Sequence, residues 1–128
     1  IGTTQWSAPE VLRGERYDAK ADIFGFGVVL WEMLAASIPH EGVDALVTAH
    51  RVAFGEARLT VPDWCPSDIA KVINACLDPD ASKRPTTKEV LAMLDKCEGS
   101  TTDSPRARKN ALDSSRRKGK RRGKKAAQ

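Results

Sequence analysis

Residues 21–36 read ADIFGFGVVLWEMLAA, and no other stretch of the chain is as apolar. Nearly every position after Asp22 is apolar, so a helix through this stretch has no face suited to water and lies inside a core. The stretch is too short, and too interrupted by Asp22 and Glu32, for a membrane span of about 20 apolar residues. It is also longer than the ~4–8 residues of an ordinary buried strand. We therefore predict a helix on which the rest of the chain packs, with these side chains buried: Ile23, Phe24, Phe26, Val28, Val29, Leu30, Trp31, Met33 and Leu34.

Residues on both sides of this stretch mark helix ends. Asp18 is placed to cap the start of the core helix, and Pro39 and Gly42 follow its end. Further upstream, Pro9 suits the first position of a short helix, because the first N–H groups of a helix have no partner within it. Gly14 then breaks that short helix.

Three more helices are expected downstream. Asp44 is placed to cap a helix that runs through Phe54 and is closed by Gly55. Ser67 is expected to cap the next helix, and Thr86-x-x-Glu89 has the pattern of a capping box for the last one. The apolar residues recur at helical spacing in all three: Leu46, Ala49, Val52 and Ala53; Ile69, Val72, Ile73, Cys76 and Leu77; Val90, Leu91, Met93, Leu94 and Cys97. The sequence thus predicts a mainly α fold.

The net charge of +4 is divided unevenly along the chain. Residues 99–128 contain eleven Lys or Arg against Asp103 and Asp113, which gives this tail a charge of +9 and leaves −5 for residues 1–98. Apolar residues become scarce after Gly99, and such segments cannot build a core. We expect one folded domain over residues 1–98 and a disordered basic tail over residues 99–128.

The tail holds two basic clusters, Arg106–Lys109 and Arg116–Lys125. Such clusters are typical of nuclear import signals, of contacts with nucleic acid and of attraction to anionic membranes. No aromatic residues lie between the basic ones, which argues against stacking on single-stranded nucleic acid. The partner expected for Arg106–Lys125 is an import receptor or a polyanion, and a solvated tail without a partner is the alternative. We expect a cytoplasmic protein, or a nuclear one if the clusters act in import.

The cysteines and histidines predict neither disulfides nor a metal site. Cys65, Cys76 and Cys97 are odd in number and lack C-x-x-C spacing, so reduced thiols are expected. His40 and His50 lack the spacing of metal ligands. The sequence also contains no candidate for a signal peptide or a transmembrane segment.

Several short motifs follow one another in an order that is specific. They are Gly2-Thr3-x-x-Trp6-x-Ala8-Pro9-Glu10, Asp22-x-x-x-x-Gly27, Trp31-Glu32-Met33, Pro39, Cys65-Pro66 and Asp78-Pro79-x-x-x-x-Arg84-Pro85. In this order they resemble the C-terminal half of a protein-kinase catalytic domain, which begins here at the A-P-E end of the activation segment. Gly2-Thr3 with Trp6 is similar to the serine/threonine pattern, and Trp31-Glu32-Met33 and Cys65-Pro66 resemble the tyrosine-kinase-like group. The resemblance covers residues 1–98 and implies the helical C-terminal lobe of a kinase, truncated at its amino-terminal side.

The motifs that perform chemistry in kinases are absent from these residues. They contain no Gly-rich loop, V-A-I-K lysine, H-R-D-x-x-x-x-N loop or D-F-G. In the family those parts hold ATP and Mg²⁺ and supply the catalytic aspartate, so none of the residues present is expected to be catalytic. We expect ATP and Mg²⁺ to serve the complete kinase and not to bind this chain alone. Its expected partners are a protein substrate and the missing amino-terminal half, and the alternative function is a non-catalytic interaction module derived from a kinase.

The resemblance implies three roles for charged and core residues. Glu10 and Arg84 resemble the pair that ties the end of the activation segment to the last loop, whereas two exposed loop charges would be the ordinary alternative. Asp22 resembles the aspartate that binds the backbone of the catalytic loop, although it could equally be a charge at a helix N-terminus. Val29 and Met33 resemble positions that support the hydrophobic column below the adenine ring, and are core residues otherwise.

The resemblance also implies a substrate-binding segment at the start of the chain. Thr3 resembles the threonine whose hydroxyl meets the catalytic aspartate of serine/threonine kinases. The pocket for the substrate residue that follows the phosphorylated one would be shaped by Gly2, Thr4, Gln5, Trp6 and Ser7. Without the resemblance, this segment is an ordinary loop.

Overall fold

The computed structural model describes residues 4–97, in which helices are joined by turns and loops. The elements are η1 (Thr4–Trp6), α1 (Pro9–Leu12), α2 (Ala19–Ala35), α3 (Ala45–Ala53), α4 (Ser67–Cys76), η2 (Ala81–Lys83) and α5 (Thr87–Asp95). No strand occurs within this range, which confirms the predicted mainly α fold. The predicted tail lies outside the described residues, and the boundary after residue 98 stays a prediction.

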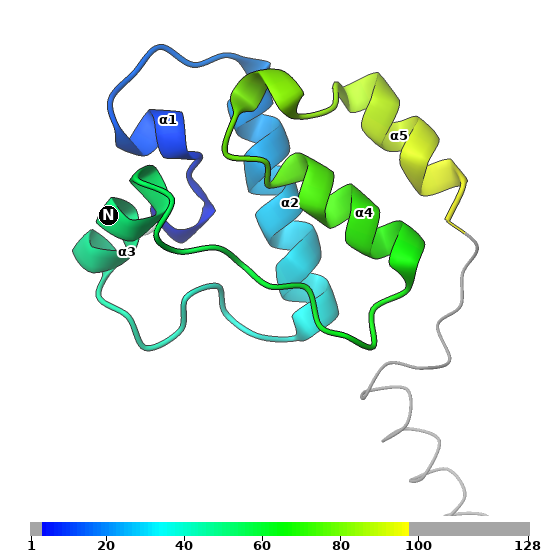
Figure 1. Cartoon of the computed structure of the whole chain (residues 1–128), viewed down its shortest axis with the longest axis horizontal. Coiled ribbons are helices and arrows are strands. Elements are labelled where there is room, and N and C mark those ends of the chain that lie inside the picture. Colours follow the sequence, from blue (N-terminus) through cyan, green and yellow to red (C-terminus); the bar gives the residue numbers. More distant parts are fainter. Residues whose placement is uncertain (1–3, 98–128) are drawn as a thin grey trace, which may run out of the picture. The chain divides into compact units, whose positions relative to one another are not determined.

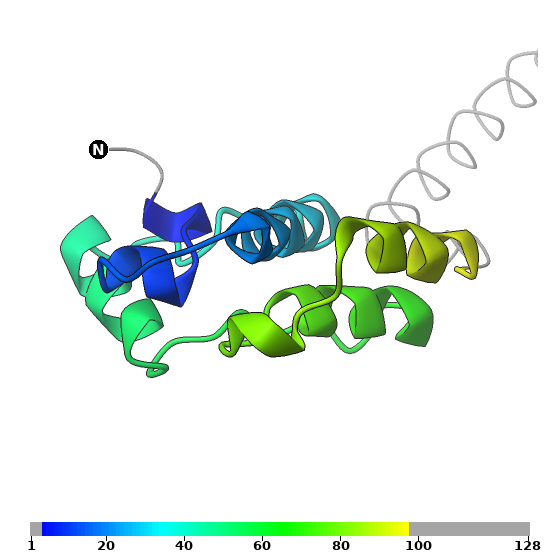
Figure 2. The same ribbon diagram turned by 90° about the horizontal axis from the view of Figure 1, so that it is seen from above.

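Helix α2 lies at the centre of the described residues, with α1 and α3 on one side and α4 and α5 on the other (Figure 1; Figure 2 shows the same from above). Phe24 and Val28 of α2 pack with Ala8 and Val52 in one cluster. Ile23 packs with residues of α4 and α5 in a second cluster. The two clusters therefore form on different faces of one helix.

Glycine allows α2 and α4 to approach closely. A Cβ atom added to Gly27 would lie 2.7 Å from the Cβ of Cys76, a distance that real Cβ atoms do not adopt. Gly27 and Cys76 are both buried. Gly27 thus permits the close packing of α2 on α4.

The helix ends follow the predicted caps in three of four cases. The carboxylate of Asp18 accepts from the backbone N–H of Lys20, and that of Asp44 caps α3 in the same way. Thr86 and Glu89 form both halves of the capping box.

The prediction for Ser67 is wrong, because Ser67 is the first helical residue of α4 and makes no side-chain cap. The preceding Pro66 takes the cap position, with an extended backbone and no polar side chain to offer.

The predicted burial is wrong for three residues of α2. Phe26, Val29 and Met33 are 39%, 44% and 73% exposed, because no other described segment packs over them. Leu46 of α3 and Leu91 of α5 are also exposed, since each lies on the outer side of a helix that is covered on one face only. Ile23, Phe24 and Val28 are buried as predicted.

Candidate functional site

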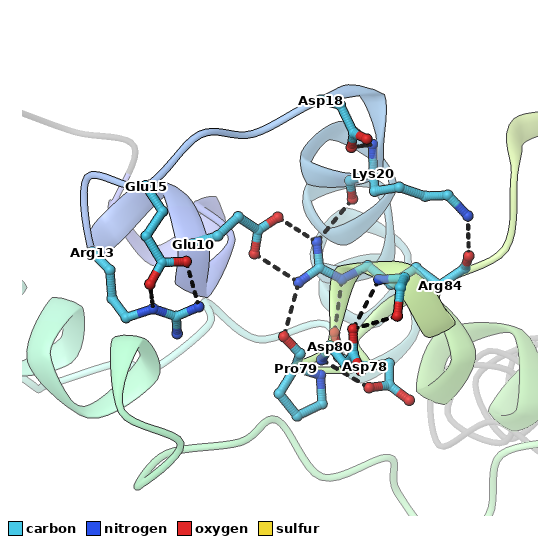
Figure 3. Close-up of polar contacts among 10 residues, drawn as sticks. Glu10, Arg13, Glu15, Asp18, Lys20, Asp78, Pro79, Asp80 and Arg84 are labelled. Carbon is cyan, nitrogen blue, oxygen red and sulfur yellow. Dashed lines mark hydrogen bonds and ion pairs between the residues drawn. The ribbon is translucent and has the colours of Figure 1, made fainter.

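The guanidinium of Arg84 lies between Glu10 of α1, Lys20 at the start of α2 and the loop that contains Asp78 and Pro79 (Figure 3). Its Nη1 donates to Oε1 of Glu10 at 2.7 Å and to the backbone carbonyl of Lys20 at 3.0 Å. Its Nη2 donates to Oε2 of Glu10 at 2.9 Å and to the carbonyl of Pro79 at 3.4 Å. Its Nε donates to the carbonyl of Asp78 at 2.7 Å. All five N–H donors of the guanidinium are therefore used.

The ion pair between Arg84 and Glu10 is buried as well as bidentate. The two side chains are 0% and 8% exposed, and the guanidinium also stacks over the ring of Phe24 at 5.0 Å. The hydrogen bonds from Arg84 lower the pKa of Glu10, against the effect of burial, which raises it. The contact expected between Glu10 and Arg84 is thus present, and it joins residues 74 positions apart.

The loop before Arg84 is shaped by its own side chains. Asp78 accepts from the backbone N–H of Asp80, and Asp80 accepts from the N–H and the hydroxyl of Ser82. These bonds shape the backbone that leads into η2, and the carbonyls of Asp78 and Pro79, just before η2, face the guanidinium (Figure 3). Lys20 closes the arrangement by donating its ammonium group to the carbonyl of Arg84.

This arrangement fixes the start of the described chain to its end. Glu10 belongs to α1, which follows the predicted substrate-binding segment, and Lys20 lies in the first turn of α2. Removing one partner of a buried ion pair lowers the free energy of unfolding by about 3–5 kcal/mol, because the other charge then stays buried without a partner. The arrangement joins α1 to the start of α2 and to the loop before Arg84.

The predicted substrate-binding residues are only partly described. Gly2 and Thr3 lie outside the described residues, whereas Thr4, Gln5, Trp6 and Ser7 form η1 and the bend after it, all half-buried. The N–H of Ser7 donates to the carbonyl of Thr4 at 3.2 Å, which closes the turn. The role of these residues in substrate binding stays a prediction.

One contact of this segment was not foreseen from the sequence. The indole Nε1 of Trp6 donates to Oε2 of Glu32, near the far end of α2, at 3.0 Å. A carboxylate inside an otherwise apolar helix needs a donor, and a nearby tryptophan N–H needs an acceptor. The presence of an unpaired carboxylate and an unpaired indole N–H in one short sequence could have predicted this contact.

The remaining predicted residues lie together on the uncovered face of α2. Asp22, Phe26, Val29 and Met33 are spaced at i, i+4, i+7 and i+11, so they form one stripe along the helix, hereafter the open stripe. Within residues 4–97 the Asp22 carboxylate is exposed and accepts no hydrogen bond. The structure does not bring the open stripe into contact with Glu10 and Arg84.

The described residues offer no metal-binding cluster of histidines, cysteines and acids. Burial lowers the pKa of His40 and raises the pKa of Cys76 to about 11, so Cys76 is a protonated core residue and not a nucleophile. Among residues 4–97, no helix is long and apolar enough to span a membrane.

Comparison with known proteins gives a consistent family. Mitogen-activated protein kinase kinase kinase 10 of Xenopus laevis is 40% identical over 93 residues, which are 73% of this chain and 9% of that protein. The Homo sapiens protein of the same name is 38% identical over 99 residues, 77% of this chain and 10% of the relative. The probable serine/threonine-protein kinase drkD of Dictyostelium discoideum is 37% identical over 111 residues, 87% of this chain and 8% of the relative.

The chain thus spans about a tenth of the length of these relatives. A family model described as protein tyrosine and serine/threonine kinase matches residues 2–94, which include η1, Glu10 and Arg84. The resemblance stated from the motifs is confirmed by this match and by the relatives. The chain belongs to the protein tyrosine and serine/threonine kinase family.

Proposed function

We propose that this chain supplies the C-terminal, substrate-binding half of a serine/threonine protein kinase domain, which transfers the γ-phosphate of ATP to protein serine or threonine in signal transduction. The observation that carries the proposal is the buried Glu10–Arg84 pair. Two hydrogen bonds of its guanidinium hold Glu10, in the segment after η1, and the other three tie it to the carbonyls of Lys20, Asp78 and Pro79. A surface loop without a function does not require such an anchor. The name of the Dictyostelium discoideum relative, a probable serine/threonine-protein kinase, supports the choice of serine and threonine as acceptors.

ATP and Mg²⁺ would be held elsewhere in the complete kinase. Phosphoryl transfer depends on positioning and on neutralising the developing charge, which in kinases falls to the Gly-rich loop, its lysine and the metal-binding acids. These motifs do not occur in residues 1–128. This chain would then bind the protein substrate and pack against the half of the kinase domain that holds ATP and Mg²⁺.

The open stripe is the surface we assign to that other half. Phe26, Val29 and Met33 expose apolar side chains along two turns of a helix whose other faces hold the buried residues. Exposed apolar patches of this kind mark interaction surfaces in soluble proteins. Asp22, at one end of the open stripe, would accept backbone N–H groups of the catalytic loop.

A hybrid domain tests the proposal. In it, residues 2–94 replace the matching segment of the Xenopus relative, and phosphate transfer from ATP to a protein substrate is measured. We expect activity in the hybrid and none in residues 1–128 alone. Within the hybrid, Arg84→Ala should abolish activity, whereas Arg58→Ala, an exposed loop residue, should not. A hybrid that folds and binds ATP but transfers no phosphate would contradict the proposal and favour the alternative, a non-catalytic interaction module.

We also propose that the basic tail directs the protein to the nucleus. Arg106–Lys109 and Arg116–Lys125 are separated by a short stretch that is mostly uncharged, the spacing of a two-part import signal. A fluorescent protein fused to residues 99–128 should accumulate in nuclei. Alanine at the second cluster's first six basic residues should abolish the accumulation: Arg116, Arg117, Lys118, Lys120, Arg121 and Arg122. Even distribution of the unaltered fusion would contradict import and leave a tail that is solvated or that binds polyanions in a salt-dependent way.

A further inference from the structure

A partly enclosed pocket lies between η1, the four helices α1 to α4 and the connector of residues 55–59. Its volume is about 240 Å³. A cavity of about 150 Å³ with apolar walls holds a benzene molecule, so this pocket has room for a molecule with two fused rings. Neither the Glu10–Arg84 pair nor the open stripe contributes a residue to its lining.

The inner wall of the pocket is apolar. Phe24, Val28 and Val52 line it, and all three are buried members of one core cluster. Leu77, at the end of α4, lines it as well and packs against the same cluster. The guanidinium of Arg84 lies over the ring of Phe24 at 5.0 Å, which helps to fix that ring. A wall of this kind, with an aromatic ring held in place, suits a flat aromatic ligand.

Polar side chains without partners complete the lining. Gln5, His40 and Asn74 all line the pocket, and within residues 4–97 none of their side chains makes a hydrogen bond. The two amides can each donate and accept, and so can a neutral imidazole. Burial lowers the pKa of His40, which keeps its imidazole neutral at pH 7.

The lining has no net charge. Its two charged side chains are of opposite sign, and no third one is present among the described residues that form it. A charged ligand would give up its hydration here without gaining a net opposite charge. The pocket therefore favours an uncharged ligand that makes hydrogen bonds.

An occupant of the pocket would contact segments from both ends of the described chain. Gln5 belongs to η1 and Pro9 begins α1, whereas Asp78 and Pro79 precede η2. The carbonyls of Asp78 and Pro79 also accept hydrogen bonds from Arg84. A ligand that touches all of these segments binds the folded chain only, and such binding stabilises the fold.

We infer that this pocket is a binding site for an uncharged, bicyclic aromatic molecule that carries a hydrogen-bonding group. The fused rings would lie against Phe24 and the neighbouring valines, and the polar group would face the amides of Gln5 and Asn74. The inference does not depend on phosphate transfer, so its test and that of the proposed kinase function fail separately.

The test uses the chain of residues 1–128 with ¹³C-labelled valine and leucine methyl groups, and β-naphthol as the probe. Ring currents of a bound aromatic molecule shift the NMR signals of nearby methyl groups, here those of Val28, Val52 and Leu77. The exposed methyl groups of Val29, in the open stripe, and of Leu91, on α5, report adsorption to apolar surface. β-Naphthoate and β-naphthylmethylammonium have the same rings with a negative and a positive charge.

Three variants accompany the probes. Leu77→Trp replaces a half-buried side chain of the lining with a larger one that fills the pocket. Leu91→Trp makes the same change at an exposed site outside the pocket and is the matched control. Asn74→Ala removes one amide at an exposed helix position, where the fold tolerates the change.

We expect β-naphthol to shift the three pocket signals saturably, with a dissociation constant below about 1 mM. At a probe concentration of about ten times that constant, the ratio of folded to unfolded chain should rise about elevenfold, measured by urea unfolding. Both charged probes, and Leu77→Trp, should weaken binding at least about tenfold, the equivalent of about 1.4 kcal/mol. Asn74→Ala should weaken it severalfold, and Leu91→Trp should leave it unchanged.

Three results would overturn the inference. The first is the absence of saturable shifts at Val28, Val52 and Leu77. The second is a response of Val29 and Leu91 as large as theirs, which would mean general adsorption to apolar surface. The third is equal affinity for the charged and uncharged probes, or unchanged affinity in both Leu77→Trp and Asn74→Ala.

Discussion

The two faces of helix α2 are built from the same kinds of residue but lie in opposite surroundings. Val28 is 1% exposed and packs with Phe24, whose ring lies under the Arg84 guanidinium. Val29, the next residue, is 44% exposed in the open stripe. The difference teaches that the apolar character of a residue predicts a helix face suited to burial but does not tell which segment covers it. We propose that the rest of a kinase domain packs on the open stripe.

The largest effect is expected from breaking the buried side at Arg84. Arg84→Ala leaves the Glu10 carboxylate buried without its partner and should lower the free energy of unfolding by about 3–5 kcal/mol. Arg58→Ala, an exposed loop residue, should change it by no more than about 0.5 kcal/mol. Urea unfolding followed by circular dichroism measures both. Similar midpoints for the two variants would show that the ion pair does not hold the fold together.

A pair of neighbouring valines gives the next effect. Val28→Ala removes buried methyl groups and should cost about 1.5–3 kcal/mol in the chain of residues 1–128. Val29→Ala should cost almost nothing there, because the side chain is already exposed and alanine is the better helix former. In the complete domain, Val29→Ala should become destabilising. If Val29→Ala destabilises residues 1–128 as much as Val28→Ala does, another part of residues 1–128 must cover the open stripe.

The smallest expected effect is a pH dependence of the free energy of unfolding, caused by the buried Glu10–Arg84 pair. Arg84 holds the pKa of Glu10 below its ordinary value of 4.5, so the folded state favours ionised Glu10. The resulting stabilisation is fully present above pH 4.5 and is lost as the pH falls below it through the lowered pKa. Glu10→Gln should therefore flatten the fall of stability on the acid side of pH 4.5. Glu15→Gln, at the exposed pair with Arg13, should flatten it less because water screens that pair. Equal flattening by both variants would contradict the difference in burial.

Local chemistry explains most of what the sequence predicted correctly. Asp18, Asp44 and the Thr86–Glu89 capping box act on backbone groups within three residues, so their roles depend on little else. Ser67 failed as a cap because the start of α4 is decided by Pro66, which precedes it. Helix existence was therefore easier to predict than the residue at which a helix begins.

The parts of the site that depend on distant residues were harder to predict. The contact between Glu10 and Arg84 was predicted from the family resemblance. The spacing alone predicts no contact, because the two charges are 74 residues apart. The bond between Trp6 and Glu32 was missed, although both residues were noted within separate motifs. Burial of Phe26, Val29 and Met33 was predicted wrongly because composition cannot tell which segment covers a helix face.

The central claim, that the open stripe receives the amino-terminal half of a kinase domain, is tested most directly at Met33. The chain has two methionines, Met33, which is 73% exposed, and the half-buried Met93, which serves as an internal reference. Their ¹³C-labelled methyl signals are recorded by NMR with a soluble nitroxide, in residues 1–128 and in the hybrid domain, with Met33→Leu for assignment. We predict that the broadening of the Met33 signal by the nitroxide falls severalfold in the hybrid while that of Met93 stays the same. Equal broadening of Met33 in both proteins would contradict the account.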